Sequence, residues 1–351
     1  MTANNTENGE GHQQQQSTNT TTTTSRSQES VETLAREAQQ LRARLDAERQ
    51  KLNDIPITKA AERVECLQAL NIKTRRVLKG HQAKVLCMDW STDKRHIVSS
   101  SQDGHHHYQQ VHHLTKSMRF QETGLDNKCT VFPLSFEDDT TNRKRAVATH
   151  TSYMSCCTFL RSDNLILTGS GDSTCAIWDV ESGQRVQNFN GHTGDIFALD
   201  VPKSETSNIF ISGGADKHAL VWDIRSGQCV QSFEGHDADI NTMHFHPNTD
   251  AFATGSDDAT CRLFDLRADR QVCVYSKDSI LFPVHGVDFS VSGRLLFAGY
   301  GDYRAAVWDS LKATRHTVLY GHDNRVSCLK TSPDGTAICT ASWDATLRIW
   351  A

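Results

Sequence analysis

The stretch Gly191–Ile224, "GHTGDIFALDVPKSETSNIFISGGADKHALVWDI", carries three marks at defined distances from one another. His192 stands near its start, Asp216 follows 24 residues later in a polar turn, and Trp222 comes six residues after the aspartate in an apolar run. Short apolar runs separated by Gly, Asp and Ser are typical of β-strands joined by turns. The stretch therefore predicts one small antiparallel sheet.

The same marks recur along the chain at a period of about 43 residues, which is typical of a repeat fold. The turn aspartates are Asp126, Asp172, Asp216, Asp258, Asp302 and Asp344. Six residues after them stand the aromatics Phe132, Trp178, Trp222, Phe264, Trp308 and Trp350. A histidine precedes four of the aspartates by 22 to 24 residues: His150, His192, His236 and His322. This repetition predicts four-stranded sheets that follow one another along the chain.

Within one sheet, the histidine and the turn aspartate are expected at the same end. A neutral imidazole can donate a hydrogen bond to the carboxylate while the aromatic packs beneath it. A catalytic His/Asp pair is the alternative, but the pair is repeated and no nucleophile accompanies it at a fixed place. We interpret these residues as structural, and the set is His81, Asp103, His150, Asp172, Trp178, His192, Asp216, Trp222, His236, Asp258, His322, Asp344 and Trp350.

The tails of four repeats resemble the WD40 repeat: "IWDV" at 177–180, "VWDI" at 221–224, "LFDL" at 263–266 and "VWDS" at 307–310. The fold that this resemblance implies is an all-β, seven-bladed β-propeller over residues 74–351. A strand near Thr74–His81 is expected to complete the last blade, which closes the ring and hides its edges.

The first repeat breaks off after its turn. His81 and Asp103 have the regular spacing, but Gln109 stands where a Trp is expected, and Asp126 follows Asp103 after only 23 residues. About 20 residues of a regular unit are missing. The first and second blades are therefore expected to be incomplete.

An aberrant segment occupies about residues 105–123 and begins "HHHYQQVHHL" (His105–Leu114). Because histidine is the commonest ligand of transition metals, a metal site is one interpretation, and adventitious binding of nickel or zinc stays open, since histidine clusters chelate without design. The segment shows neither the alternation of a half-buried strand nor a Trp-Asp-like tail. We therefore interpret it as an altered splice product or a misread exon boundary, and we predict no metal site and no cofactor.

Composition excludes several classes of function. The net charge of the 351 residues is −5 and the basic residues are scattered, which disfavours nucleic acid as a partner. The sequence shows no apolar run of membrane-spanning length and no signal peptide, so the protein is predicted to be cytoplasmic. No phosphate loop, zinc spacing or nucleophile with a base is present, which argues against an enzyme. The 11 cysteines form no C-x-x-C pair and are interpreted as reduced core residues rather than reactive thiols.

The N-terminal part is not repetitive. Residues 1–28 are almost devoid of apolar side chains and are predicted to be disordered. Residues 29–53 carry a heptad seam and predict a coiled-coil helix that needs a partner helix, since alone it would leave a leucine stripe in water. The alternative is a helix that folds back on its own domain. Residues 54–73 are predicted to be a linker with a short helix over Ala60–Ile72, capped by Thr58.

Longer stretches extend the resemblance to the β subunit of heterotrimeric G proteins. They are the helix followed by seven nominal repeats, "ATGSDDATCRLFDLRAD" at 253–269, "GHDNRVSCL" at 321–329 and "HTSYMSCC" at 150–157. The resemblance covers roughly residues 30–104 and 124–351. It implies a non-enzymatic signalling scaffold that pairs with a γ subunit and binds the GDP-bound α subunit, receptor and effectors. Attachment to the inner face of the plasma membrane would come only through the prenyl group of γ.

The resemblance also assigns two sets of contact residues. The helix would bind γ through Leu34, Leu41, Leu45 and Leu52. Positions that match the α-contacting motif are Lys84, Met88, Leu125, Asn127, Tyr153, Asp195, Asp239, Asn241, Asp257 and Trp343. Aromatic residues are the expected anchors, and the aspartates are expected to pair with basic residues of α. The alternative for each aspartate is a solvated position on the rim.

The chain departs from the family at several positions. The family carries an aromatic in place of Leu86, a Met in place of Phe197 and an Asp in place of Gly301. The family's Trp and Met contacts at the start of the second repeat fall in the missing stretch, so we expect weaker binding to α. Two other interpretations stay open: a WD40 adaptor of another complex, and a defective isoform whose ring cannot close.

Overall fold

The computed structural model describes residues 31, 33–45, 47–48, 55–90, 96–102, 106–110, 119–123, 127–133, 145–160, 164–204 and 207–351. The chain divides into two units, residues 1–55 and 56–351. In the first unit, residues 31, 33–45, 47 and 48 are helical. Leu34, Leu41 and Leu45 of this helix are 50 to 64% exposed, whereas Leu52 and residues 1–28 lie outside the described residues.

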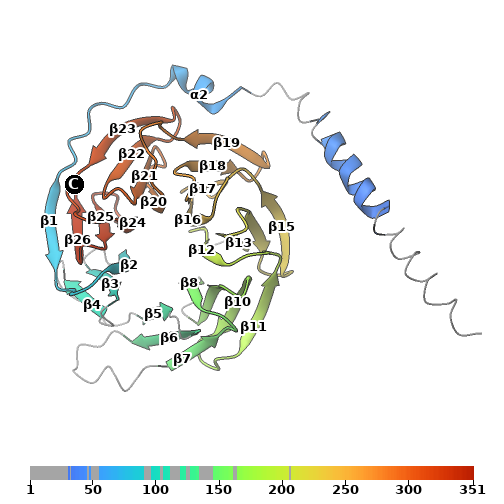
Figure 1. Ribbon diagram of the computed structural model, residues 1–351, viewed down its shortest axis with the longest axis horizontal. Helices are drawn as coiled ribbons and strands as arrows, with labels where there is room; N and C mark the ends of the chain where they lie inside the picture. The colour runs from blue at the N-terminus through green and yellow to red at the C-terminus, as the bar shows by residue number, and fades with distance from the viewer. Residues whose placement is uncertain are drawn as a thin grey trace, which may run out of the picture. The chain divides into compact units, whose positions relative to one another are not determined.

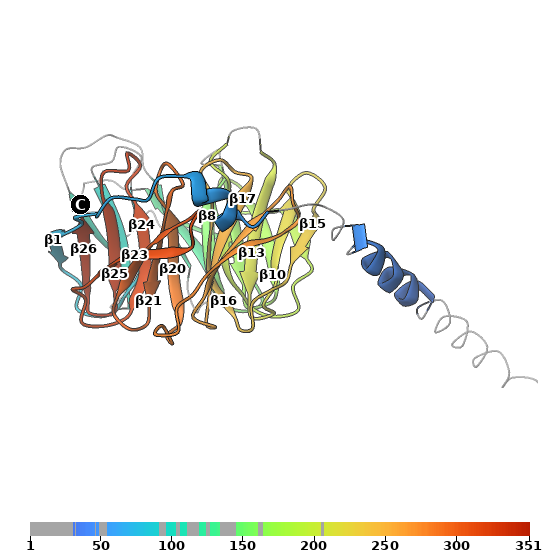
Figure 2. The ribbon, with the colours of Figure 1, turned by 90° about the horizontal axis from the view of Figure 1, so that it is seen from above.

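Residues 56–351 form a ring of seven antiparallel sheets, which we call blades 1 to 7 in chain order (Figure 1). Within the described part of the chain, five blades have four strands, and blades 1 and 2 have three. The strands run between the two faces of the ring, and the turns gather at these faces (Figure 2). This arrangement is the WD40-type β-propeller that the repeats predict.

In each blade, the strands follow one another along the chain from the innermost to the outermost, and only the outermost strand of blade 7 comes from elsewhere in the sequence. Blade 1 has β2 (Val85–Trp90), β3 (His96–Ser101) and β4 (His106–Gln110), and blade 2 has β5 (Arg119–Thr123), β6 (Lys128–Pro133) and β7 (Arg145–Thr149). Blade 3 has β8 (Met154–Phe159), β9 (Leu165–Ser170), β10 (Thr174–Asp179) and β11 (Arg185–Asn190), and blade 4 has β12 (Ile196–Asp200), β13 (Ile209–Gly214), β14 (Ala219–Asp223) and β15 (Gln228–Phe233). Blade 5 has β16 (Ile240–Phe245), β17 (Ala251–Ser256), β18 (Cys261–Asp265) and β19 (Arg270–Tyr275), and blade 6 has β20 (Val284–Phe289), β21 (Leu295–Tyr300), β22 (Ala305–Asp309) and β23 (Thr314–Leu319). Blade 7 has β24 (Val326–Thr331), β25 (Ile338–Ser342), β26 (Thr346–Trp350) and β1 (Thr74–Lys79).

The outer strand of blade 7 is the first strand of the chain, as predicted. β1 pairs with β26 in an antiparallel ladder in which Val77 lies opposite Arg348. Beyond the ladder, the backbone groups of Lys73 and Ala351 exchange two hydrogen bonds of 3.1 Å. Both ends of the propeller sequence are therefore tied into one sheet, which closes this side of the ring.

Blades 1 and 2 meet at the aberrant segment. Part of the histidine tract forms β4, which pairs with β3, although the sequence lacks the alternation expected of a strand. The ladder can form because it joins backbone groups, which every residue except Pro carries in full. Asp103 and Asp126, the two turn aspartates around this segment, lie outside the described residues.

Neighbouring blades approach closely through small residues on their second strands. A Cβ added at Gly255 of β17 would lie 2.5 Å from Cγ1 of Val284 on the next inner strand, and one at Gly299 would lie 2.7 Å from Cγ1 of Val326. Gly169 and Gly213 hold the same position on β9 and β13, and each would meet an isoleucine at 3.0 Å. Glycine here allows branched side chains of one blade to pack on the backbone of the blade before it.

The predicted helix over Ala60–Ile72 is wrong. A short helix, α2 (Ile57–Ala60), continues as one 3₁₀ turn over Ala61–Arg63, and the N-cap is Pro56, with no side-chain hydrogen bond from Thr58. The residues that follow are irregular because Leu70 and Ile72, two positions apart, both pack on the core, which suits an extended chain better than a helix. Among the described helices, none is long and apolar enough to cross a membrane.

Candidate functional site

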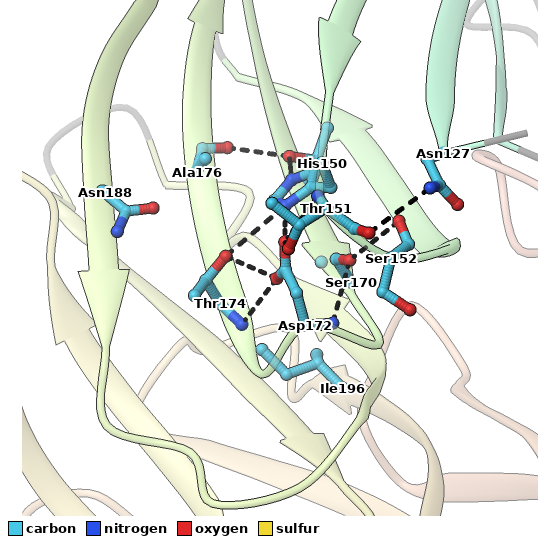
Figure 3. Close-up of polar contacts among 12 residues, drawn as sticks. Asn127, His150, Thr151, Ser152, Ser170, Asp172, Thr174, Ala176, Asn188 and Ile196 are labelled. Atoms are coloured by element: carbon cyan, nitrogen blue, oxygen red, sulfur yellow. Dashed lines mark hydrogen bonds and ion pairs between the residues drawn. The ribbon is translucent and has the colours of Figure 1, made fainter.

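Four blades, 3, 4, 5 and 7, hold their turn aspartate through a buried hydrogen-bond chain. In blade 3, Nδ1 of His150 lies 2.9 Å from Oδ2 of Asp172, and Nε2 lies 2.8 Å from the hydroxyl of Thr168 (Figure 3). The indole N–H of Trp178 donates to the same hydroxyl at 2.9 Å. Because a carboxylate only accepts, Nδ1 of His150 donates, and Nε2 accepts from Thr168. The predicted His, Asp and aromatic are thus joined by a Thr that the sequence reasoning missed.

The same chain recurs in blades 4, 5 and 7. The distances from Nδ1 to Oδ2 are 2.7 Å for His192–Asp216, 2.7 Å for His236–Asp258 and 2.8 Å for His322–Asp344. The linking hydroxyls belong to Ser212, Thr254 and Thr340. Trp222 and Trp350 donate to this hydroxyl, whereas blade 5 carries Phe264, which cannot. In blade 1, Nε2 of His81 lies 2.8 Å from the hydroxyl of Ser99.

These chains are built to hold turns and leave no room for a substrate. The four paired histidine side chains are at most 2% exposed. Burial alone would raise the pKa of Asp172, but hydrogen bonds from Thr174 and His150 lower it to about 2. Similar bonds hold the pKa of Asp258 and of Asp344 well below the ordinary value despite burial. Each turn is therefore fixed by an ionised carboxylate under the surface.

Above these chains, the inner strands begin at a rim of equivalent positions. In six blades, the residue just before the inner strand accepts a backbone hydrogen bond of 2.8 to 3.1 Å from the turn between the second and third strands. We call these residues the rim, and the acceptor and donor pairs are Lys84 and Gln102, Tyr153 and Gly171, Asp195 and Ala215, Asp239 and Asp257, Pro283 and Gly301, and Arg325 and Trp343.

The rim brings together most of the residues that the family resemblance nominates for binding α. Six of them belong to it: Lys84, Tyr153, Asp195, Asp239, Asp257 and Trp343. Asn241 lies beside it and donates to Oδ1 of Asp257 at 2.5 Å. Asn127 lies at the same end of blade 2, where its carbonyl accepts from the amide of His150 at 3.0 Å.

Of the remaining nominated residues, one is buried and one lies outside the described part of the chain. The assignment of Met88 to a binding surface is corrected by its burial: Met88 is only 2% exposed and packs in an apolar cluster with Val85 and Ile97. Its position in the middle of β2 turns the side chain into the core between blades 7 and 1. Leu125 lies outside the described residues.

One arc of the rim is basic and aromatic. The ammonium of Lys84 and the guanidinium carbon of Arg325 each lie 4.0 Å from the centroid of a Trp343 ring. These distances are within the range of cation–π contacts. Sequence reasoning missed Arg325, although it precedes an inner strand, as Lys84 and Asp239 do, and this register could have identified it.

The opposite arc is acidic. The hydroxyl of Tyr153 donates to Oδ2 of Asp195 at 2.7 Å and so joins blades 3 and 4. Burial and this hydrogen bond raise the pKa of Tyr153 to about 12, so the phenol keeps its proton. Asp239 and Asp257 follow on blade 5. The rim therefore offers a partner two regions of opposite charge, with one large aromatic on the basic side.

Seven sheets around one axis, with buried histidines that hold the turns beneath a polar rim, define the class of WD40 propeller proteins. Residues 112–351 match the family described as "G protein beta WD-40 repeat protein", and residues 72–106 match "WD domain, G-beta repeat". The chain is 71% identical over 342 residues to "Guanine nucleotide-binding protein subunit beta-2" of Caenorhabditis elegans, which covers 92% of this chain and 93% of that protein. It is 55% identical over 344 residues to "Guanine nucleotide-binding protein subunit beta-5b" of Danio rerio, with 92% and 87% covered. The chain belongs to the G protein β subunit family.

The histidine tract spans the junction of the two family matches, which leave residues 107–111 uncovered. Among the described residues, no group of three or more His, Cys, Asp or Glu side chains is arranged to hold a metal ion. His105, His112 and His113 are not among those residues.

Proposed function

We propose that this protein is a non-enzymatic G protein β subunit that pairs with γ and presents its rim to the GDP-bound α subunit. After nucleotide exchange releases α, the same rim is free for effectors in receptor-coupled signalling. The observation that carries this proposal is the rim itself. Six nominated residues from five blades hold one or the other of the two rim positions, acceptor or donor, at one end of the ring.

The chemistry of the rim suits reversible docking. Trp343 offers a large flat anchor beside two cations, which can attract a carboxylate of the partner. Asp195 and Asp239, on the acidic arc, can pair with a basic segment of the same partner. Because both arcs are needed for one orientation, partners that use this rim exclude one another.

The test is the affinity of the purified complex with γ for immobilised GDP-bound α, measured by biolayer interferometry. We expect Trp343→Ala and Asp239→Lys each to weaken binding at least about tenfold, which corresponds to about 1.4 kcal/mol. Val291→Ala is the matched control, because Val291 is exposed in the turn after an inner strand, at the opposite end of the ring. Equal affinity of the two rim variants and the control would overturn the assignment of the rim.

We further propose that the N-terminal helix forms a coiled coil with γ through Leu34, Leu41, Leu45 and Leu52. Support comes from the exposure of the first three, which are at least half exposed in the described helix. Replacing Leu41 and Leu45 together by Asp is expected to abolish co-purification with γ, because charges in a heptad seam are strongly unfavourable. Arg44→Ala, beside the seam, is the control. Undiminished co-purification of the Asp variant would contradict the coiled coil.

In this proposal, the protein is cytoplasmic and reaches the inner face of the plasma membrane only through prenylated γ. Expression with a γ subunit whose prenylated cysteine is changed to serine is expected to move the chain from the membrane fraction to the cytosolic one. Membrane association that survives this change would show another anchor.

A further inference from the structure

The inner strands of five neighbouring blades, 4 to 7 and 1, carry a charged or titratable residue at the same position. This position is near the strand end that lies away from the rim. The fifth residues of β12, β16, β20, β24 and β2 are Asp200, His244, Asp288, Lys330 and Asp89. Their order around the ring alternates acidic and basic. The inner strands belong to separate sheets and contact each other side by side, so neighbouring blades carry residues of opposite type at the same position.

His244 is held between carboxylates from both neighbouring blades. Its Nδ1 lies 2.9 Å from Oδ2 of Asp200, and its Nε2 lies 3.0 Å from Oδ1 of Asp288. Nδ1 makes no hydrogen bond of good geometry, so its contact with Asp200 is an ion pair by distance rather than a hydrogen bond. A neutral ring would turn a nitrogen lone pair toward one of the two carboxylates, so the two contacts favour the imidazolium form of His244.

The two carboxylates also bind the backbone of the next blade. Oδ2 of Asp200, in blade 4, accepts from the amide of Phe245 in blade 5 at 2.7 Å. Oδ2 of Asp288, in blade 6, accepts from the amide of Thr331 in blade 7 at 2.6 Å. Together with the two contacts of His244, these bonds form an unbroken series of polar links from blade 4 to blade 7.

The surroundings support a charged histidine in spite of its burial. His244 is 8% exposed and Asp288 is 4% exposed. Four strands pack against β16. Two of them, β13 and β17, carry no titratable side chain. β12 contributes Asp200, and β20 contributes Asp288 and the neutral ring of His285. Burial alone would lower the pKa of His244, but the two aspartates raise it to about 9. Lys330, on β24, opposes this rise, and its own pKa stays above the ordinary value because Asp288, Asp89 and Asp200 outweigh its burial.

We propose that Asp200, His244 and Asp288 form a clasp that locks blades 4 to 7 together, and that loss of the His244 proton opens it. The clasp is separate from the rim and from the helix, and it adds a conformational control to the propeller itself. The folded pKa of His244, about 9, lies above the ordinary value of 6.5. Its contribution to stability is thus complete below pH 6.5 and is lost as the pH rises through 9.

The test follows the thermal unfolding midpoint of the full-length chain from about pH 6 to about pH 10, a range that spans the ordinary and the folded pKa of His244. We expect His244→Gln to lower the midpoint by several degrees at the acidic end, and we expect its curve to meet that of the unmutated protein at the alkaline end. His246→Gln is the matched control, since His246 contacts the amide oxygen of Asn248 and forms no ion pair with a carboxylate among the residues that the structure describes. Its curve should run parallel to that of the unmutated protein. A difference between His244→Gln and the unmutated protein that is constant with pH would overturn the proposal.

Hydrogen exchange gives a second readout that needs no variant. The amides of Phe245 and Thr331 are expected to lose at least about tenfold in protection between about pH 7 and about pH 10, after correction for the intrinsic rate. Peptides from β22 in the same protein should keep theirs. With Asp200→Asn, the loss should begin at least about one pH unit lower, because one of the two charges that hold the proton is gone. Equal protection of all these peptides at both pH values would refute the clasp.

Discussion

Removing one buried hydroxyl should cost different amounts in two blades that look alike. Thr340 in blade 7 and Thr254 in blade 5 are both fully buried and hold the same position in the hydrogen-bond chain. The hydroxyl of Thr340 bonds Nε2 of His322 at 2.7 Å and the indole N–H of Trp350 at 2.8 Å. The hydroxyl of Thr254 bonds His236 at 2.6 Å but no indole, because the Trp of that blade is replaced by Phe.

The magnitude follows from the groups that Thr→Val leaves without a partner. Valine has nearly the same shape as threonine, so the main loss is the hydroxyl and its hydrogen bonds. A buried donor or acceptor left unsatisfied costs about 1–3 kcal/mol. Thr254→Val leaves one such group and should cost about 1–3 kcal/mol, whereas Thr340→Val leaves two and should cost about 2–6 kcal/mol. The difference is the cost of burying one unpaired indole N–H.

Urea unfolding followed by far-ultraviolet circular dichroism measures both free energies of unfolding. A third variant, Thr168→Val in blade 3, removes a hydroxyl that bonds both a histidine and a Trp, and it should behave as Thr340→Val does. The double variant Thr340→Val with Trp350→Phe should lose less free energy of unfolding than the sum of the losses of the two single variants, because the indole N–H that Thr340→Val leaves unpaired is absent from it. The reasoning is refuted if Thr254→Val costs as much as Thr340→Val, or if the double variant shows additive losses.

Two further predictions concern pH and packing. The pKa of Asp172 is about 2 in the folded protein against 3.8 ordinarily, so its contribution to stability is present above pH 3.8 and is lost as the pH falls through 2. Acid-unfolding curves of Asp172→Asn should lack this part of the transition. Gly255→Ala places a methyl group 2.5 Å from Val284 and should destabilise by about 1–3 kcal/mol in thermal melts. Gly301→Ala, whose new methyl has no neighbour closer than 3.6 Å, should change the free energy of unfolding by less than about 0.5 kcal/mol. Equal effects of Gly255→Ala and Gly301→Ala would contradict the packing argument.

The residues that sequence reasoning found share one property, which is that their spacing is local. His192 and Asp216 pair within one blade, and the same distance in other repeats made the pair visible. Met88 shows the limit of this reasoning, because agreement with a family motif did not indicate that the side chain points into the core. The prediction of a helix over Ala60–Ile72 was wrong for a similar reason. Leu70 and Ile72 are apolar because they pack on another part of the ring, and the sequence of their own segment does not reveal this contact.

The sequence by itself determined the repeat, the strands and the aspartates that end the turns, because the repeat and its marks depend on neighbours within about 45 residues. The outer position of β1 was predicted from the way a propeller closes its ring, and not from local spacing. Only the tertiary structure decided which side chains meet between blades. Arg325 and Lys84 lie on one Trp343, and His244 lies between Asp200 and Asp288, because closing the sheets around an axis places equivalent positions side by side. Such contacts depend on the spacing of blades in the ring, and no segment of one blade records it.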